Sequence, residues 1–262
     1  MNQPTNNSQN LYLVFKNILL NVFARIWAVW GLISFIVTFL IILIPSLITS
    51  IIPDPKGMLY FYRLSNLWMK TWFFLVRCKI DIRGTAYFKQ GQSYIVTCNH
   101  NSLLDIPLSS PFIPGANKTI AKKTFTKVPL FGWYYSRGSV IVDRSDASSR
   151  RKSFDLMKAA LDKGLHMCIY PEGTRNRTDQ PLKSFYDGAF RLAVSTKHAI
   201  IPAVILNTSN ALPVNKFFYF LPAKLSIHFL PPVYPENFSA TEMKEQVFNL
   251  MKDYYTEHST LR

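Results

Sequence analysis

Residues 93–105 read SYIVTCNHNSLLD. The apolar run Tyr94–Cys98 is typical of a buried β-strand, and a cluster of polar side chains follows it directly. Polar groups at the end of a core strand cost free energy unless they are paired or used. His100 and Asp105 are a candidate pair, because an imidazole that is oriented by a carboxylate acts as a general base near neutral pH. This stretch therefore predicts a strand that ends in a catalytic site.

The spacing of His100 and Asp105 restricts where the pair can lie. Positions five apart do not share a face of a regular helix, so the two side chains meet only if His100 lies on the turn before a helix. Asn99 and Ser102 suit that turn as capping residues. Ser102 has an alternative role as a nucleophile, but the chain lacks a G-x-S-x-G elbow around it. We therefore expect Asn99 and Ser102 to support the turn.

Beyond residue 77 the chain alternates short apolar runs with helical patterns. The apolar runs predict strands at Ser93–Cys98, Lys118–Ala121, Ser139–Val142, His166–Tyr170, Ile200–Leu206 and Leu225–Leu230. The helical patterns predict helices at Ser148–Lys163 and Gly188–Ser195, and a last one after the capping box Ser239–Glu242. Strands interleaved with helices indicate an α/β domain around a central sheet.

The N-terminal part contains an apolar segment, residues 27–52, without a charged side chain. At helical rise it is long enough to cross a hydrocarbon core, and it is longer than a buried core helix usually is. It shows no cleavage site of small residues, so we expect it to be retained. Pro45 leaves two arrangements open, a kinked spanning helix or two shorter pieces within one leaflet.

Three regions follow from this pattern. We expect the first ten residues, rich in Asn and Gln, to be disordered, residues 11–78 to form a membrane-associating helical region, and residues 79–262 to form the catalytic domain. Leu11–Arg25 and Leu67–Arg77 combine apolar or aromatic side chains with basic ones, as interfacial elements do. Because basic residues flank the apolar segment on both sides, the positive-inside rule gives no orientation.

The composition is strongly basic, with 30 Lys and Arg against 15 Asp and Glu and a net charge of +15. Such a surface attracts anions, and we expect anionic membrane lipids among the partners; a solvated surface without a specific partner is the alternative. Nucleic acid is not expected as a partner, because the basic residues are dispersed and no RNP-like or zinc-finger pattern occurs. Cys78, Cys98 and Cys168 are widely spaced, so we expect buried free thiols in a reducing compartment and no metal site.

Two further blocks carry chemistry. Residues 137–144 read RGSVIVDR, a strand that ends in an acid–base dipeptide, and Arg144 taken alone is better explained as an ordinary surface arginine. Residues 170–175 read YPEGTR and follow another apolar strand. Pro and Gly supply a sharp turn, the amides after it are free to bind an anion, and Arg175 offers a bidentate fork for phosphate.

Together these blocks resemble the glycerolipid acyltransferase family, and within it the bacterial 1-acylglycerol-3-phosphate acyltransferases. The family pattern is an NHxSxxD block, a GxxxxxR block, an EGTR block and a short strand with proline, and here all four occur in that order, ending at Ile201-Pro202-Ala203-Val204. The resemblance extends from the N-terminal apolar stretch to Val204. It implies an α/β fold with a mixed central sheet flanked by helices, preceded by a hydrophobic helical membrane element.

The resemblance also implies roles for single residues. His100 is the expected catalytic base and Asp105 its partner, while Asn99, Ser102 and Pro202 support the motif structurally. The residues expected to bind the phosphate of the acceptor, directly or in support, are Gly138, Arg144, Glu172, Gly173, Thr174, Arg175, Lys122 and Lys123. One departure occurs at Asp187, where related sequences commonly carry a lysine in F-K-x-G-A-F; an acid there weakens phosphate binding or indicates another head group.

The implied reaction is acyl transfer from acyl-CoA or acyl-carrier protein to the sn-2 hydroxyl of lysophosphatidic acid, which gives phosphatidic acid without a cofactor. The implied location is the bacterial inner membrane, with the catalytic domain facing the cytoplasm. Alternatives are transfer to another lyso-lipid such as a lyso-aminolipid, and hydrolysis by a membrane esterase or thioesterase with Ser102 as nucleophile. A basic adaptor without catalysis is a further alternative, but it gives no reason for an acid at Asp105.

Overall fold

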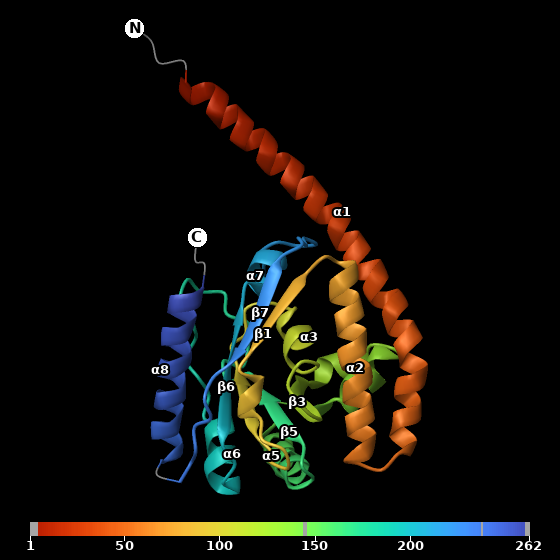
Figure 1. The fold of residues 1–262 in the computed structure, drawn as a ribbon, viewed down its shortest axis with the longest axis vertical. Helices are drawn as coiled ribbons and strands as arrows, with labels where there is room; N and C mark the ends of the chain where they lie inside the picture. The colour runs from red at the N-terminus through yellow and green to blue at the C-terminus, as the bar shows by residue number, and fades with distance from the viewer. Residues whose placement is uncertain (1–4, 144–145, 237, 260–262) are drawn as a thin grey trace.

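A seven-stranded sheet lies at the centre of the computed structural model, which describes residues 5–143, 146–236 and 238–259 (Figure 1). Within these residues the strands are β1 Lys79–Arg83, β2 Ile95–Cys98, β3 Asn117–Lys122, β4 Ser139–Val142, β5 His166–Ile169, β6 Ile200–Leu206 and β7 Lys224–Phe229. Their order is β1-β7-β6-β2-β5-β3-β4, and every neighbouring pair is parallel except β6 and β7. The mixed sheet predicted for this chain is confirmed.

The strands follow from their residues. Every residue of β2, β5 and β6 is buried, as expected for apolar runs in the middle of a sheet covered on both faces. All six predicted strands are present, with ends that differ by at most two residues. β1 was not predicted, because its Lys-Ile-Asp-Ile-Arg alternation is typical of a half-exposed edge strand and contains no continuous apolar run.

Helices cover both faces of the sheet. α6 Gly188–Thr196 and α8 Ala240–His258 lie on one face, and α2 Lys56–Leu75 with α1 Thr5–Ile48 lies on the other (Figure 1). The remaining helical segments are α3 Asp105–Ser109, α4 Phe131–Arg137, α5 Ala147–Asp162, α7 Thr208–Ala211 and the short 3₁₀ turns η1 Thr49–Ile51, η2 Thr85–Tyr87 and η3 Lys123–Lys127. The predicted capping box is present, because Ser239 and Glu242 exchange hydrogen bonds between side chain and backbone at the start of α8.

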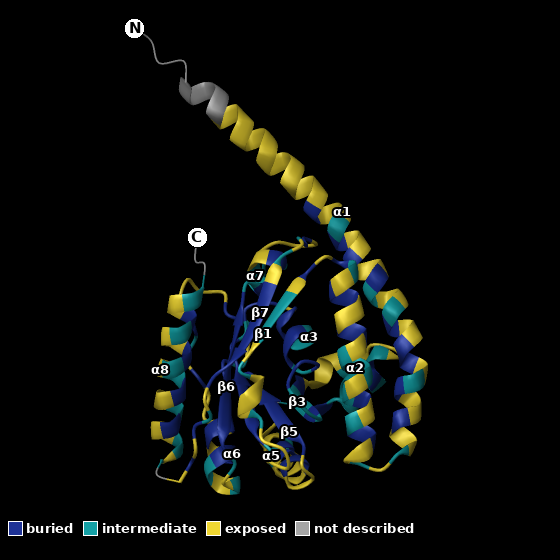
Figure 2. Cartoon of the chain, in the orientation of Figure 1, coloured by how far each residue is buried: buried dark blue, intermediate teal, exposed yellow. Residues whose placement is uncertain are grey.

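The N-terminal helix α1 has two parts. From Leu11 to Phe23 its residues are exposed on every side, whereas from Ala24 onward one face is buried against α2 and the body of the protein (Figure 2). Residues 5–10, within the stretch expected to be disordered, belong to α1 in this structure, and residues 1–4 lie outside the described part. A helix extends from an existing turn far more easily than it starts, which explains the longer helix. Pro45 lies in the last turn and does not split the segment.

The apolar segment 27–52 is packed along one side. Trp68 Nε1 donates to Thr38 Oγ1 at 2.9 Å, and Trp72 Nε1 donates to the Gly31 carbonyl at 3.0 Å. One hydrophobic core runs from α1 and α2 into the sheet, across the domain boundary predicted at residue 78. Among the described residues, Asn10–Ile51 is the single helical stretch long and apolar enough to cross a membrane, which weakly supports membrane association.

Candidate functional site

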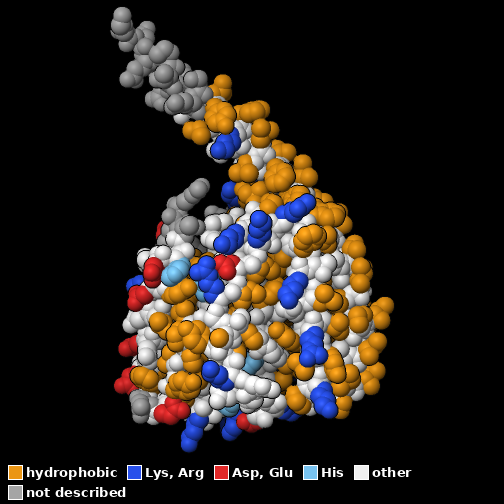
Figure 3. Space-filling model, viewed as in Figure 1, with side chains coloured by type: hydrophobic (Ala, Val, Ile, Leu, Met, Phe, Trp, Pro, Cys, Tyr) orange, Lys and Arg blue, Asp and Glu red, His pale blue; other side chains and the backbone are white. Residues whose placement is uncertain are grey.

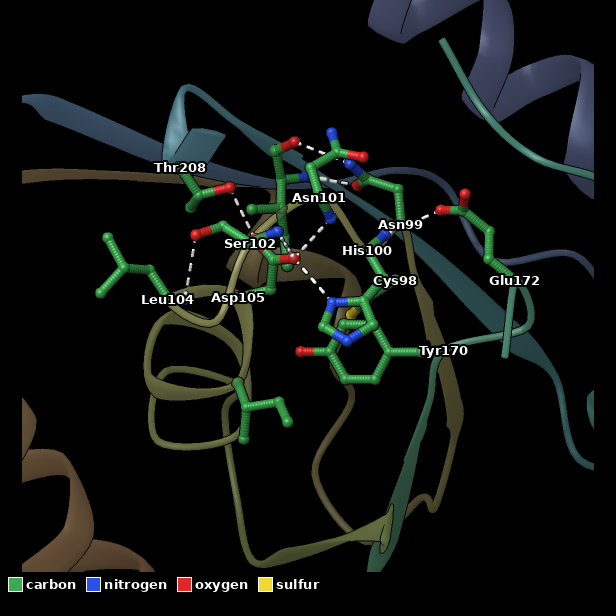
Figure 4. Close-up of polar contacts among 12 residues, drawn as sticks. Cys98, Asn99, His100, Asn101, Ser102, Leu104, Asp105, Tyr170, Glu172 and Thr208 are labelled. Carbon is green, nitrogen blue, oxygen red and sulfur yellow. Dashed lines mark hydrogen bonds and ion pairs between the residues drawn. The ribbon is translucent and has the colours of Figure 1, made fainter. Parts of the chain in front are cut away.

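His100 and Asp105 meet at the end of β2. The strands β2, β3, β4, β5 and β6 are all parallel to one another. Their carboxyl ends therefore share one edge of the sheet, called here the carboxyl edge. His100 follows β2 at this edge, and Asp105 is the first residue of α3. His100 Nδ1 lies 2.7 Å from Asp105 Oδ2 (Figure 4). The spacing correctly predicted that this pair meets only with His100 on the turn before the helix.

Asp105 is fully buried, and its carboxylate is saturated with donors. The backbone N–H groups of Asn101 and Ser102 donate to Oδ2 at 2.6 and 2.7 Å, and Thr208 Oγ1 donates to Oδ1 at 2.6 Å (Figure 4). These bonds compensate the burial of the charge and hold the carboxylate in place. Thr208, which begins α7 more than a hundred positions away, was missed because no sequence pattern connects it with Asp105.

The imidazole of His100 has one occupied and one open nitrogen. Because an ionised carboxylate only accepts hydrogen bonds, Nδ1 carries the proton of the neutral ring and Nε2 keeps its lone pair. Among the described residues, none forms a hydrogen bond with Nε2, and the side chain is 15% exposed. The ring of Tyr170 lies beside the imidazole with its centroid 4.6 Å away, and its hydroxyl bonds Ser109 at 2.5 Å. This arrangement can accept a proton from a substrate at Nε2.

Glu172 joins the two loops of the site. Its Oε1 accepts a hydrogen bond from the backbone N–H of His100 at 2.7 Å, and its Oε2 accepts one from the backbone N–H of Lys183 at 2.9 Å. The backbone N–H of Asn176 donates in turn to the His100 carbonyl at 2.6 Å. The side chain is 1% exposed; burial raises the pKa of Glu172 to about 7, and the two amide hydrogen bonds act in the opposite direction. Glu172 therefore fixes the backbone at His100 and Lys183, and its carboxylate is not available at the surface.

The rest of the EGTR block lies at the surface beside His100. Gly173 has φ +72°, a conformation that glycine adopts without strain. Thr174 is exposed, and its Oγ1 accepts a hydrogen bond from Lys183 Nζ at 2.8 Å. Arg175 is half-buried, and within the described residues no carboxylate pairs with it. Lys183 was not predicted, although its position eight residues after the block expected to bind an anion was a usable signal.

The other expected anion-binding residues are dispersed. Lys122 ends β3 and Lys123 follows it, so both exposed ammonium groups lie at the carboxyl edge, two strands from β2 and about 10 Å away by strand spacing. Gly138 precedes β4 and thus lies at the opposite edge, where an added Cβ would be 3.2 Å from the Phe61 ring. The structure does not bring Gly138 to the site. Arg144 lies outside the described residues.

The supporting residues hold the site through other contacts than expected. Asn99 does not cap the turn: its side chain accepts from the backbone N–H of Ile205 and donates to the carbonyl of the same residue, which ties β2 to β6. Ser102 does support the turn, because its fully buried Oγ accepts from the Leu104 N–H at 3.3 Å and donates to the Leu212 carbonyl at 2.8 Å. Pro202 lies within β6 opposite Thr97 of β2.

Two remaining expectations concern charge and thiols. Asp187 precedes α6, and its carboxylate forms an ion pair with Lys244 of α8 at 2.7 Å. The charge of Asp187 is therefore compensated on the face of the sheet that α6 and α8 cover. The three cysteines are free and buried, and the Sγ atoms of Cys98 and Cys168 lie 3.8 Å apart. In the part of the chain that the structure describes, no group of three or more His, Cys, Asp or Glu side chains is arranged to hold a metal ion.

Comparisons with known proteins find matches among acyltransferases. The family model described as "Acyltransferase" matches residues 79–206. A 1-acyl-sn-glycerol-3-phosphate acyltransferase from Cocos nucifera is 32% identical over 181 residues, 68% of this chain and 57% of that protein. The protein of the same name from Salmonella typhimurium is 27% identical over 172 residues, 64% of this chain and 67% of that protein.

The likeness extends to a solved structure. The crystal structure of the 1-acyl-sn-glycerophosphate acyltransferase from Thermotoga maritima matches with a TM-score of 0.76 at 25% sequence identity. The match covers 90% of this chain and 96% of that one, and so includes the two N-terminal helices at least in part. The coconut protein, by contrast, is matched over little more than half of its length.

Proposed function

We propose that this chain is a 1-acylglycerol-3-phosphate acyltransferase, a member of the acyltransferase family whose model matches residues 79–206. The reaction transfers an acyl group from a thioester, acyl-CoA or acyl-carrier protein, to the sn-2 hydroxyl of lysophosphatidic acid. The product is phosphatidic acid, a precursor of phospholipids. The open Nε2 of His100, opposite an Nδ1 held by a buried carboxylate, is the observation that carries the proposal.

Each step of the transfer uses groups already described. His100 Nε2 takes the proton of the sn-2 hydroxyl while the oxygen bonds to the thioester carbonyl carbon. Asp105 keeps the proton on Nδ1 and stabilises the imidazolium that forms. The tetrahedral intermediate then expels the thiolate, and the imidazolium returns the proton to its sulfur. No acyl-enzyme forms, and no cofactor is needed.

The phosphate of the acceptor is assigned to the surface of the EGTR block. Arg175 offers a bidentate fork, and Lys183 brings an ammonium group to Thr174 beside it. Lys122 and Lys123 add positive charge along the same edge. Glu172 acts through the backbone that it holds, because a buried carboxylate does not bind a phosphate. Fixing the phosphate turns an encounter of two substrates into a positioned reaction.

Hydrolysis through Ser102 is disfavoured by the contacts of that side chain. Its Oγ is buried and donates to the Leu212 carbonyl, and in Figure 4 it points away from the His100 ring. A serine nucleophile needs the base within hydrogen-bond reach. A fluorophosphonate probe should therefore leave Ser102 unlabelled, and a covalent adduct there would favour the esterase.

The proposed setting is the bacterial inner membrane, with the catalytic domain on the cytoplasmic side. The apolar α1 supports attachment, since the lipid acceptor resides in the bilayer. Three free, buried thiols support a reducing compartment.

The deciding experiment supplies membranes that contain the protein with a labelled acyl donor and a panel of lyso-lipids. We expect labelled phosphatidic acid from lysophosphatidic acid, and its loss in His100→Ala. Product from a lyso-aminolipid alone would contradict the acceptor but leave acyl transfer intact. Release of free fatty acid without any transfer product would contradict the reaction itself.

A further inference from the structure

We propose that the loop of residues 216–219 is a second lipid-contacting element, which seats the carboxyl edge of the sheet on an anionic membrane leaflet. The loop lies between α7 and β7 and is hydrogen-bonded to Ala24 and Arg25 of α1. This proposal concerns how the domain sits on the membrane, and it is independent of which acyl donor or acceptor the enzyme uses.

The tip of this loop consists of two exposed aromatic residues. Phe217 is 88% exposed and Phe218 is 39% exposed, with ring centroids 6.3 Å apart. The next residue, Tyr219, is buried, and Lys216 Nζ lies 4.3 Å from the centroid of its ring. Exposing the apolar surface of phenyl rings to water is unfavourable, whereas aromatic rings flanked by lysine are typical of the membrane interface. The chemistry of the tip therefore suits lipid head groups and the upper acyl region.

The tip is fixed at the point where α1 leaves the body. Arg25 Nη1 donates to the Phe217 carbonyl at 3.3 Å, and the Phe220 N–H donates to the Ala24 carbonyl at 3.1 Å. Ala24 is also where α1 changes from exposure on every side to burial along one face. The Phe220 ring stacks on Trp72 of α2, which secures the base of the loop. The tip therefore lies beside the point where the fully exposed part of α1 begins.

Basic side chains surround this tip. The exposed cations, called here the basic rim, are Arg25, Arg77, Lys79, Lys216 and Lys224. Lys79 and Lys224 are paired at the start of β1 and β7, and Lys224 alone in this set has a carboxylate within ion-pair distance among the described residues. Figure 3 shows Lys and Arg side chains gathered where α1 joins the body. Basic residues near an anionic leaflet are attracted to it, so the rim suits acidic lipid.

The loop is also connected to the catalytic turn. Thr208 donates to Asp105, Ser102 donates to the Leu212 carbonyl, and the Leu221 N–H donates to the Ala211 carbonyl. The segment between α7 and β7 thus runs from the buried carboxylate to the aromatic tip and back. Contact of the tip with lipid therefore sets the height of the catalytic edge above the leaflet that supplies the acceptor.

An acidic leaflet is favoured over a second copy of the chain as the occupant. Two copies that met through this surface would oppose one basic rim to another, and the like charges would repel. A leaflet with anionic head groups meets both requirements at once, since it offers negative charge at the rim and an apolar interior for the rings.

The test places an environment-sensitive fluorophore on Phe217→Cys in the full chain. The native cysteines are buried, so the new thiol is the reactive one. The matched control is Tyr234→Cys, because Tyr234 is 52% exposed and adjoins Val233, which pairs with the first residue of β6 at the opposite edge of the sheet. Both proteins are bound to vesicles of phosphatidylglycerol or phosphatidylcholine, and the accessibility of the label to acrylamide is measured.

On phosphatidylglycerol we expect a blue shift and a severalfold loss of acrylamide quenching at position 217, with neither at position 234. Adding Lys216→Glu and Lys224→Glu should restore quenching at 217. Equal quenching at the two positions on bound protein would overturn the proposal, and equal protection on neutral and anionic vesicles would overturn its electrostatic part. If the label at position 217 became less accessible to acrylamide as the protein concentration rose in detergent without vesicles, a second copy of the chain would cover the tip. That result would also overturn the proposal.

Discussion

The backbone N–H of His100 donates a hydrogen bond to the buried carboxylate of Glu172 at 2.7 Å. This contact joins the two motifs that the sequence separates by more than seventy residues, and it fixes the backbone of the proposed base from the side opposite Asp105. The second oxygen of the same carboxylate accepts a hydrogen bond from the backbone N–H of Lys183, so one buried side chain organises both the proposed base and the proposed anion-binding surface.

Glu172 should make the stability of the protein depend on pH. Burial raises its pKa to about 7 from 4.5, so the folded state binds a proton more tightly than the unfolded state between these values. The free energy of unfolding is therefore expected to fall as pH rises through this window, by a contribution on the order of 3 kcal/mol, and to level off above it. Urea unfolding in detergent micelles at pH 5 and pH 8 measures the difference.

The variant Glu172→Gln should remove most of this pH dependence and lower kcat, because an amide supplies only one of the two acceptor atoms. Glu257→Gln, at an exposed position of α8, is the matched control. An unchanged kcat with a raised KM for lysophosphatidic acid would instead mean that Glu172 contacts the substrate.

Asp105→Asn should reduce kcat by roughly 10³- to 10⁴-fold with little change in KM, since the amide no longer holds the reactive tautomer of His100. Asp187→Asn, which removes an exposed carboxylate paired with Lys244, should retain full activity. Steady-state kinetics with both substrates varied separate the two parameters. A variant Asp105→Asn with near-normal kcat would exclude the proposed role of the carboxylate.

Thr208→Val keeps the shape of the side chain and removes the donor to Asp105 Oδ1. Removing a hydrogen-bond donor from a buried carboxylate lowers the free energy of unfolding by about 1–3 kcal/mol. We therefore expect roughly a tenfold fall in kcat together with a lower melting temperature. Thr256→Val on the exposed side of α8 is the control. If stability falls while kcat is unchanged, Thr208 has only a structural role.

Arg175→Lys should raise the KM for lysophosphatidic acid by about tenfold or more, because lysine cannot form the bidentate contact with a phosphate. The matched control is Arg177→Lys, two positions further on and exposed. The KM for the acyl donor should not change. An equal effect of both substitutions would show that general positive charge, rather than the fork of Arg175, attracts the acceptor.

Much of the sheet was predictable, because buried strands carry continuous apolar runs that are visible without a structure. β6 Ile200–Leu206 and β4 Ser139–Val142 have the bounds that their residues predicted. β1 was missed because an edge strand is half-exposed and its partner, β7, is distant in sequence. Likewise, the helix through residues 5–10 was not predictable from a polar composition, since its nucleus lies in the apolar residues that follow.

By itself the sequence determined which groups are candidates for the chemistry, since the spacing of His100 and Asp105 and the turn residues of the EGTR block are local properties of the chain. Only the tertiary structure decided the contacts among distant segments: Thr208 on Asp105, Glu172 on His100, and Lys183 beside Thr174. It also removed Gly138 from the site, because a residue before a parallel strand lies at the edge opposite to one that follows it. Local patterns encode which groups are present, whereas strand order and burial decide which of them meet.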